Sequence, residues 1–257
     1  MRVMYIDCSN GISGDMALKA LLEAGADSGF VEAEREKMHA AIHRSEHEDF
    51  GGAADHYHGH DHDHHSHEHG HEHDHNDQDN HDHHHDYGQR GYRQIMELIG
   101  AAGLEEQTEK YLTDIYTVIA KAEAEVHGAD PDTVHFHEVG RDEAILNLTG
   151  TAAAAASLKP GRIICSPVHD GHGTIKCSHG VIPVPVPAVA AMKKYCDYTF
   201  VQDDVDTEMV TPSGLGVLIG LGAAPGEKPE GEPSASGEGK GSRDIGRDHG
   251  LVISIYE

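Results

Sequence analysis

The sequence has few basic residues, and this scarcity limits the partners that we expect. Lysine and arginine together number 19 against 45 aspartates and glutamates, which gives a formal net charge of -26 at pH 7. An acidic surface repels the phosphates of nucleic acids and of anionic membranes. We therefore expect neither nucleic acid nor a membrane as a partner, and the charge instead suits the binding of cations.

Cysteines are also scarce, and long apolar runs are missing. The four cysteines, Cys8, Cys165, Cys177 and Cys196, are widely spread and form no CxxC pair, so a disulfide framework is not expected. The N-terminus carries no basic region followed by an apolar signal core, and no apolar run approaches the length that crosses a bilayer. These absences predict a reduced, cytoplasmic protein.

The length of 257 residues predicts one α/β (or α+β) domain, with a mixed sheet and packed helices, interrupted by an insertion. Residues 1–54 and 91–257 form the two parts of the domain, residues 55–90 form the insertion, and a flexible loop is expected near 223–241. Apolar spacing predicts helices at 16–24, 30–44, 91–103, 104–127 and 141–158, and from Pro187. Strands are expected at 3–6, 162–167, 174–177, 198–202 and 251–256, with a loop at 169–173.

The insertion is the most biased stretch of the chain. From Asp55 to Asp86 it is almost entirely His, Asp, Glu, Asn and Gly, and it holds 15 of the 25 histidines. Without aliphatic side chains to bury, it cannot offset the entropy of folding and is predicted to be disordered. Its imidazoles suit capture or storage of a divalent transition metal, Ni, Zn, Cu or Co, although a polar low-complexity spacer is the alternative. We expect capture by His60, His62, His64, His65, His67 and His69.

The segment VHFHEVGRDEAILNLTG, residues 134–150, contains a second candidate metal site. If the chain is extended there, His135 and His137 point to one face and Glu138 to the other, whereas a helix would place His135 and Glu138 on one face. Two histidines and a carboxylate just before a helix suit metal or acid/base chemistry. We expect His135 and His137 as metal ligands, and His137 and Glu138 as catalytic candidates.

A second group of candidate ligands follows later in the chain. His169 and His172 lie in the expected loop, and Cys177 and His179 lie just past the strand that follows it. These four side chains can complete a metal ligand set from another part of the chain. The alternative stays open that they are ordinary polar loop residues and that Cys177 is a small buried side chain.

Two turns rich in glycine and hydroxyl groups are candidate anion sites. GISGDM joins the first strand to a helix that Ser13 or Asp15 can cap, and TPSG begins another helix with Thr211 and Ser213. Backbone N–H groups at helix starts hold phosphates or carboxylates. We therefore expect Ser13, Gly14, Thr211 and Ser213 at a bound cofactor and Asp15 as a catalytic candidate. GISGDM is neither a Walker loop nor GxGxxG, and a turn that only joins strand to helix is the alternative.

Four short runs, taken in order along the chain, resemble one family. They are YIDCSNGISGDMALKALLEAG, VHFHEVG, CSHGVIPVPVPA and EMVTPSGLGVL. They are similar to the DxxSGISGDM, HFHEVG, HGxxPVPAPA and ELVTPTG segments of the LarC family, the nickel-insertion proteins that mature the nickel-pincer cofactor. The runs span nearly the whole chain, with a histidine-rich insertion where the family often carries one. By this resemblance the sequence is identified as the N-terminal part of a family member.

The resemblance implies a nickel chelatase, or cyclometallase, that inserts Ni(II) into pyridinium-3,5-bisthiocarboxylic acid mononucleotide. One nickel–carbon and two nickel–sulfur bonds form, CTP is consumed, Mg or Mn is needed, and the product serves lactate racemase-type enzymes. Loss of the pyridinium C–H requires a base near the ring, for which Glu138 or a histidine of HFHEVG is the candidate. A C-terminal CTP-binding partner or a frameshift extension is expected to supply CTP binding.

One departure from the family pattern favours a rival interpretation. The family's VDSIVDIVG reads DEAILNLTG here, so that Glu143 and Asn147 replace two aspartates. Asn147 cannot act as an anionic metal ligand. The rival interpretation is a non-catalytic nickel-storage or metallochaperone protein, in which the histidine tract is the functional part.

Overall fold

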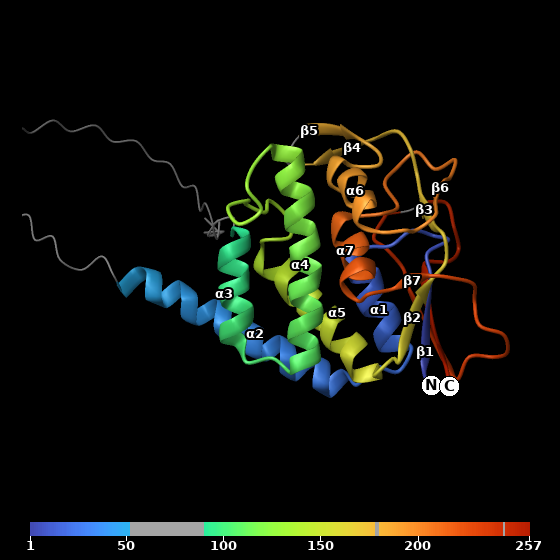
Figure 1. The fold of residues 1–257 in the computed structure, drawn as a ribbon, viewed down its shortest axis with the longest axis horizontal. Helices are drawn as coiled ribbons and strands as arrows, with labels where there is room; N and C mark the ends of the chain where they lie inside the picture. The colour runs from blue at the N-terminus through green and yellow to red at the C-terminus, as the bar shows by residue number, and fades with distance from the viewer. Residues whose placement is uncertain (52–89, 178–179, 244) are drawn as a thin grey trace, which may run out of the picture.

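The computed structural model describes residues 1–51, 90–177, 180–243 and 245–257, except for the side chains of residues 47–51. These residues form an α/β fold with a mixed sheet, which confirms the predicted fold class (Figure 1). The expected insertion at 55–90 lies outside the described residues apart from Arg90. Within the described part of the chain, no helix combines the length and the apolar character needed to cross a membrane.

The main sheet consists of strands β1 (Val3–Asp7), β2 (Arg162–Cys165), β7 (Ala224–Pro225), β8 (Ala235–Gly239) and β9 (Leu251–Tyr256). Its strand order is β7–β2–β1–β9–β8, with β1, β2 and β7 parallel, and with β9 antiparallel to both β1 and β8. Along β1 the side chains alternate between two faces. Met4 and Ile6 enter the main core, whereas Tyr5 packs with Ile164 and Tyr256 on the other face.

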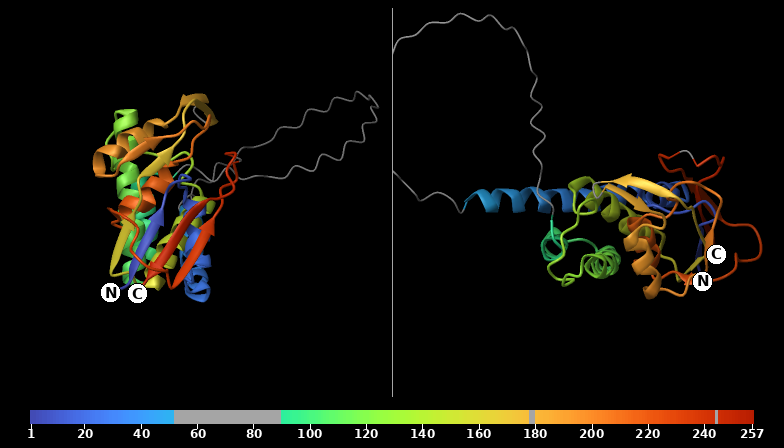
Figure 2. Two further views of the ribbon diagram at one scale, coloured as in Figure 1. Left: turned by 90° about the vertical axis from the view of Figure 1, so that its right-hand side faces the viewer. Right: turned by 90° about the horizontal axis from the view of Figure 1, so that it is seen from above.

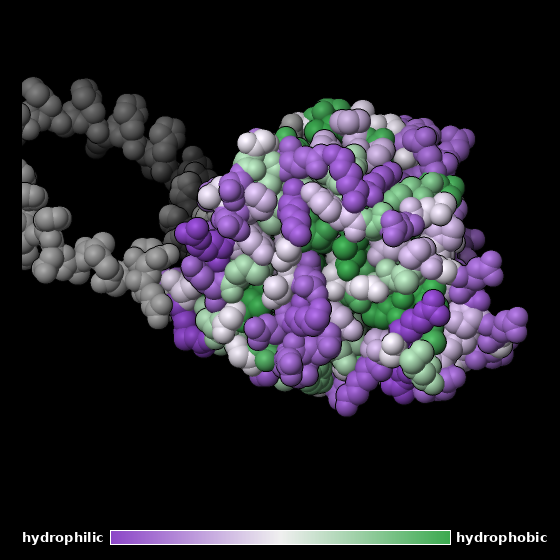
Figure 3. Space-filling model, viewed as in Figure 1, coloured by the Kyte–Doolittle hydropathy of each residue, from purple (hydrophilic) through white to green (hydrophobic). Residues whose placement is uncertain are grey.

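Helices cover one side of this sheet (Figures 1 and 2). They are α1 (Gly14–Glu23), α2 (Ser28–Gly51), α3 (Tyr92–Ala102), α4 (Glu106–His127), α5 (Asp142–Leu158), α6 (Pro187–Met192) and α7 (Pro212–Gly220), with a 3-10 turn at Lys193–Tyr195. Each helix expected from apolar spacing is present with its ends within two residues, except that α2 continues seven residues past the expected end at residue 44. Hydrophilic side chains dominate the face shown in Figure 3, with only small apolar areas between them.

Helix α5 is the centre of the helical layer. It contacts α1, α2 and α4, and every residue from 148 to 156 is buried. A helix that is buried on all sides needs small side chains so that its neighbours can approach closely, and the alanine run from Ala152 to Ala156 provides them. The buried α5 thus links the sheet-bound helix α1 to the outer helices α2 and α4.

Two short pairs of strands lie beyond the main sheet. Strands β3 (Val168–Asp170) and β6 (Phe200–Gln202) are parallel, and β4 (Thr174–Cys177) and β5 (Gly180–Pro183) form an antiparallel pair. The predicted loop at 169–173 is wrong at its start, because His169 and Asp170 belong to β3. Three residues are too few to produce a periodic apolar pattern, so the strand is defined only by its partner far along the chain.

The expected flexible loop near 223–241 is also corrected by the structure. Strand β7 and strand β8 both lie within it, and β8 forms an edge of the main sheet. Gly237 and Gly239 let β8 lie directly on α1, since an added Cβ would be 2.2 Å from the Ala20 carbonyl oxygen and 1.9 Å from the Met16 carbonyl oxygen. The glycines that indicated a linker are therefore needed for close packing.

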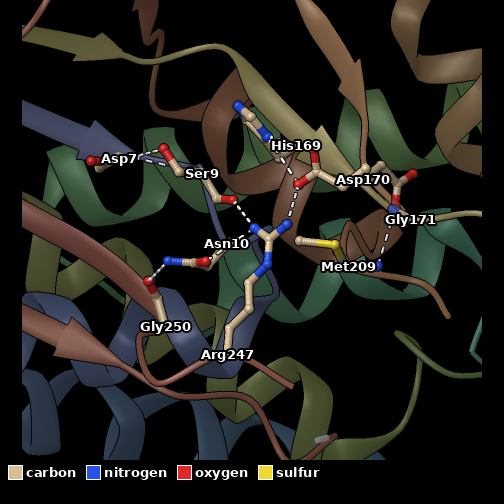
Figure 4. Close-up of polar contacts among 10 residues, drawn as sticks. Asp7, Ser9, Asn10, His169, Asp170, Gly171, Met209, Arg247 and Gly250 are labelled. Atoms are coloured by element: carbon tan, nitrogen blue, oxygen red, sulfur yellow. Dashed lines mark hydrogen bonds and ion pairs between the residues drawn. The ribbon is translucent and has the colours of Figure 1, made fainter. Parts of the chain in front are cut away.

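The carboxylate of Asp170 fixes the segment that leads into α7 (Figure 4). Its Oδ1 accepts hydrogen bonds from the backbone N–H groups of Gly171, Met209 and Val210, at 2.9, 3.0 and 3.1 Å. Asp170 is only 3% exposed. The next residues then pair with the loop after β1, because Ile12 N donates to Met209 O at 2.9 Å and Thr211 N donates to Ile12 O at 3.1 Å. Asp170 thereby brings the starts of α1 and α7 side by side.

Replacing Asp170 tests this junction. We expect Asp170→Ala to lower the free energy of unfolding by about 3 kcal/mol or more, because three backbone donors lose their acceptor at about 1–3 kcal/mol for each buried unpaired donor. Asp170→Asn keeps an oxygen acceptor and should cost clearly less. Urea unfolding of both variants measures the difference, and an equal loss in the two would contradict the assigned role.

Adding a methyl group to β8 tests its contact with α1. We expect Gly237→Ala to destabilise the fold by about 1–3 kcal/mol, the usual cost of overpacking. The matched control is Gly100→Ala on the exposed surface of α3, where an added Cβ meets no atom within 4 Å. That change should stabilise by about 0.5–1 kcal/mol, since alanine favours a helix over glycine. Thermal unfolding of the two variants should therefore shift in opposite directions.

Candidate functional site

A cavity of about 230 Å³ lies where three segments of the chain meet. These segments are the loop and first turn after β1, the residues that lead into α7, and the residues between β8 and β9. The polar side chains that line the cavity are Asn10, Ser13, Asp15, Glu208, Thr211, Lys240, Ser242, Arg243, Arg247 and His249. Three of these side chains, Lys240, Arg243 and Arg247, are cationic, although the chain as a whole is strongly acidic.

Two helix starts converge beside this cavity, as the anion-site prediction requires. Ser13 is the N-cap of α1 and accepts from Met16 N at 3.3 Å, and Thr211 is the N-cap of α7 and accepts from Gly214 N at 3.0 Å. Ser213 Oγ lies 2.9 Å from Thr211 Oγ1. The positive ends of two helix dipoles therefore face one region, which favours a bound anion.

Gly14 lies in the same junction as these hydroxyl groups. A Cβ at Gly14 would be 3.4 Å from both Ser213 Oγ and Asn147 Oδ1. The four residues expected at a cofactor are consequently grouped, although only Ser13 and Thr211 line the cavity itself. Asn147 Oδ1 is buried and has no hydrogen-bond partner among the described residues.

The cationic wall of the cavity comes from the segment between β8 and β9. Arg243 Nη1 donates to Glu208 Oε2 at 2.6 Å, and Arg247 Nη2 donates to Asp203 Oδ2 at 2.6 Å. Arg247 Nη1 also donates to the Ser9 carbonyl oxygen at 2.6 Å, which ties this segment to the loop after β1 (Figure 4). Sequence reasoning missed both arginines because they follow a stretch whose composition indicated a linker.

Glu208 is the buried carboxylate of the cavity. It is 7% exposed, and burial raises its pKa above the ordinary value of 4.5. The hydrogen bond from Arg243 opposes this shift, and the negative charges of Asp170 and Glu138 add to it. Glu208 therefore binds a proton more readily than an exposed glutamate does. It belongs to the quoted run EMVTPSGLGVL, but no spacing rule singled it out.

A second set of polar contacts connects β3 to Arg247 through Asp203. His169 Nδ1 lies 3.0 Å from both carboxylate oxygens of Asp203, and Arg247 Nη2 donates to one of these oxygens, Oδ2. Burial opposes ionisation of Asp203, but the hydrogen bonds from Arg247 and His169 outweigh burial and hold the pKa of Asp203 below its ordinary value of 3.8. The charged Asp203 therefore fixes the orientation of the His169 ring.

The HFHEVG segment takes the extended conformation at its start and then turns. Val134 and Phe136 are buried, and the Phe136 ring packs 5.8 Å from the Tyr116 ring, whereas His135 and Glu138 are exposed. The half-buried His137 has its ring 6.0 Å from that of His127. None of His135, His137 and Glu138 lines the 230 Å³ cavity, although the charge of Glu138 influences Glu208.

The other expected ligands lie in β3, in the turn between β3 and β4, and at the end of β4. His172 Nε2 lies 3.1 Å from Asp204 Oδ1, and Cys177 ends β4. His179 lies outside the described residues, as do His60, His62, His64, His65, His67 and His69. Within the part of the chain that the structure describes, no three His, Cys, Asp or Glu side chains are arranged to hold a metal ion. The metal-ligand roles of these residues stay predictions.

Curated proteins similar to this chain carry names that refer to nickel insertion. The chain is 34% identical to the pyridinium-3,5-bisthiocarboxylic acid mononucleotide nickel insertion protein of Acetivibrio thermocellus, over 98% of this chain and 59% of the relative. Proteins with the same name from Geobacillus kaustophilus and Akkermansia muciniphila are 34% and 35% identical, each over 95% of this chain and 57% of the relative. The chain thus spans less than two thirds of the length of these relatives.

No solved structure matches this chain. The model of the family described as "Nickel insertion protein" matches residues 4–255, and this match includes both helix starts and all three segments around the cavity. The resemblance seen in the four short runs is therefore confirmed, and the chain belongs to the nickel insertion protein family, LarC.

Proposed function

We propose that this chain binds Ni(II) and inserts it into pyridinium-3,5-bisthiocarboxylic acid mononucleotide, which makes it a nickel chelatase of nickel-pincer cofactor synthesis. The observation that carries the proposal is the convergence of two capped helix starts, at Ser13 and Thr211, on one cavity with a cationic wall. A mononucleotide carries a phosphate, and helix starts with nearby Arg and Lys side chains are suited to bind it. The cavity therefore supports the proposal, because its lining suits a phosphate group.

The remaining parts of the activity are assigned by the resemblance. CTP and Mg or Mn belong to a C-terminal part or partner, which accords with a chain that spans 59% of a curated relative. The product is delivered to a lactate racemase-type apoenzyme, and the reaction takes place in the cytoplasm.

The histidine-rich tract of the sequence captures Ni(II), because dense imidazoles and carboxylates raise the local concentration of divalent cations.

A nickel-storage or metallochaperone protein is the second candidate function. It is favoured by the fact that the described residues contain no cluster of three metal-binding side chains, whereas the histidine tract is dense. In this case the cavity has no part in nickel chemistry. The two candidates differ in whether the chain changes the mononucleotide covalently.

The decisive experiment is an insertion assay. The chain is incubated with Ni(II), CTP, Mg and the bisthiocarboxylated mononucleotide, with and without the C-terminal part supplied as a second polypeptide, and the nickelated product is detected by mass. We expect product with the C-terminal part present. Deleting residues 55–86 should raise the Ni(II) concentration that is needed but leave the saturated rate nearly unchanged. No product under any condition, with stoichiometric nickel binding that disappears with the tract, would instead establish storage.

Variants of the helix caps test the anion site in the same assay. We expect Ser13→Ala combined with Thr211→Val to raise the KM for the mononucleotide about tenfold or more, since hydrogen bonds to charged groups contribute about 1.5–3 kcal/mol each. The matched control is Thr174→Val, at an exposed threonine that does not line the cavity. Circular dichroism of each variant checks folding, because loss of a cap also costs about 1 kcal/mol. An unchanged KM in a folded double variant would place the phosphate elsewhere.

A further inference from the structure

We propose that Glu208 is the catalytic base of nickel insertion, the group that takes the proton from the pyridinium carbon as nickel binds to it. The inference rests on the proposed function and deepens it. Glu208 lines the cavity and is 7% exposed, and it lies three residues before Thr211, the N-cap of α7. A substrate whose phosphate occupies the helix starts therefore places its ring in the same small cavity as this carboxylate.

The position of Glu208 is fixed by its backbone. The carboxylate of Asp170 holds the next two residues through the N–H groups of Met209 and Val210, and Ile12 N donates to Met209 O. A base must be held within hydrogen-bonding distance of the proton that it removes. Asp170 is accordingly a positioning residue for Glu208.

The surroundings of Glu208 suit proton transfer. Burial and the charges of Asp170 and Glu138 raise the pKa of Glu208, and the hydrogen bond from Arg243 lowers it. The Arg243 side chain is 48% exposed and also lines the cavity, so an anionic thiocarboxylate of the substrate can bind it in place of Glu208. Such an exchange frees the carboxylate at the moment when it must act as a base.

Other carboxylates near the cavity are less suitable. Asp15 is 43% exposed, accepts from Ser13 Oγ at 2.6 Å and pairs with Lys19 at 3.4 Å. Glu138, the base expected from the sequence, is exposed and does not line the cavity. Asp203 is ionised and bound by Arg247 and His169. Only Glu208, among the described carboxylates, is both buried and part of the cavity lining.

The proposed step is balanced without a redox partner. The C–H bond of the pyridinium ring breaks, its electron pair forms the nickel–carbon bond, and the proton moves to a carboxylate oxygen of Glu208. The two thiocarboxylate sulfurs donate electron pairs to the same ion, and nickel remains Ni(II). The proton then leaves Glu208 to solvent, since the cavity is open to the surface near Lys240 and His249.

The test uses the full chain with the C-terminal part and compares four variants over a range of pH. In the unchanged chain, kcat should fall at low pH as Glu208 becomes protonated, with a midpoint above the ordinary value of 4.5. Glu208→Gln should lower kcat by about 10²–10⁴-fold, the usual contribution of a general base, and remove the acid limb of the profile, with little change in KM. Glu208→Asp should restore part of the rate together with the limb.

Two further variants separate the outcomes. Glu36→Gln on the exposed face of α2 is the control and should match the unchanged chain. If Glu208→Gln is folded and keeps both its rate and its acid limb, or if Glu138→Gln alone removes the limb, the assignment of Glu208 is overturned while the proposed function stands. If the unchanged chain with its C-terminal part makes no product, the proposed function fails and the role of Glu208 fails with it.

Discussion

The site depends on one buried carboxylate. Asp170 gathers three backbone N–H groups with a single oxygen, and two of them belong to the segment that leads into α7. Without this acceptor, Met209 and Val210 would have buried donors without partners, and their pairing with Ile12 would lose its support. The pairing of the two helix starts and the place of Glu208 depend on that short junction between distant parts of the chain.

The charge distribution gives the cavity its chemical character. The chain has a formal net charge of -26, yet Lys240, Arg243 and Arg247 all line one cavity of about 230 Å³. Arg243 and Arg247 are each paired with a carboxylate, which neutralises the site until a ligand enters. An acidic surface that attracts cations and a local cationic wall that suits an anion are both compatible with the proposed insertion of Ni(II) into a phosphorylated substrate.

Much of the fold could be predicted from the sequence because its signals are local. The apolar run of β1, the helical spacing of α3 to α5, and the caps Ser13 and Thr211 are all encoded within a few residues. Strand β8 could not be predicted, because glycines such as Gly237 and Gly239 are typical of a linker. Here they are needed because β8 packs directly on α1, which is visible only in the fold. Strand β3 was missed because it is short and its partner lies far along the chain.

The candidate site was predicted in part for the same reason. The hydroxyl and glycine residues of the two turns follow a local pattern and could be proposed from the sequence, whereas Glu208, Arg243 and Arg247 become functional candidates only through contacts between distant segments. The histidines of HFHEVG show a different limit of local patterns. Their spacing predicts a metal site, which stays a prediction, whereas the burial of Phe136 between them and the exposure of His135 are seen only in the fold.

The most direct test of the central claim, that the starts of α1 and α7 form one anion site, is a titration followed by NMR. Nicotinic acid mononucleotide, a pyridinium mononucleotide with a single phosphate, is added to the ¹⁵N-labelled chain, and the amide signals of Asp15 and Ser213 are followed. The account predicts that both signals move with one shared dissociation constant. Movement of only one, or two different constants, would contradict a single site.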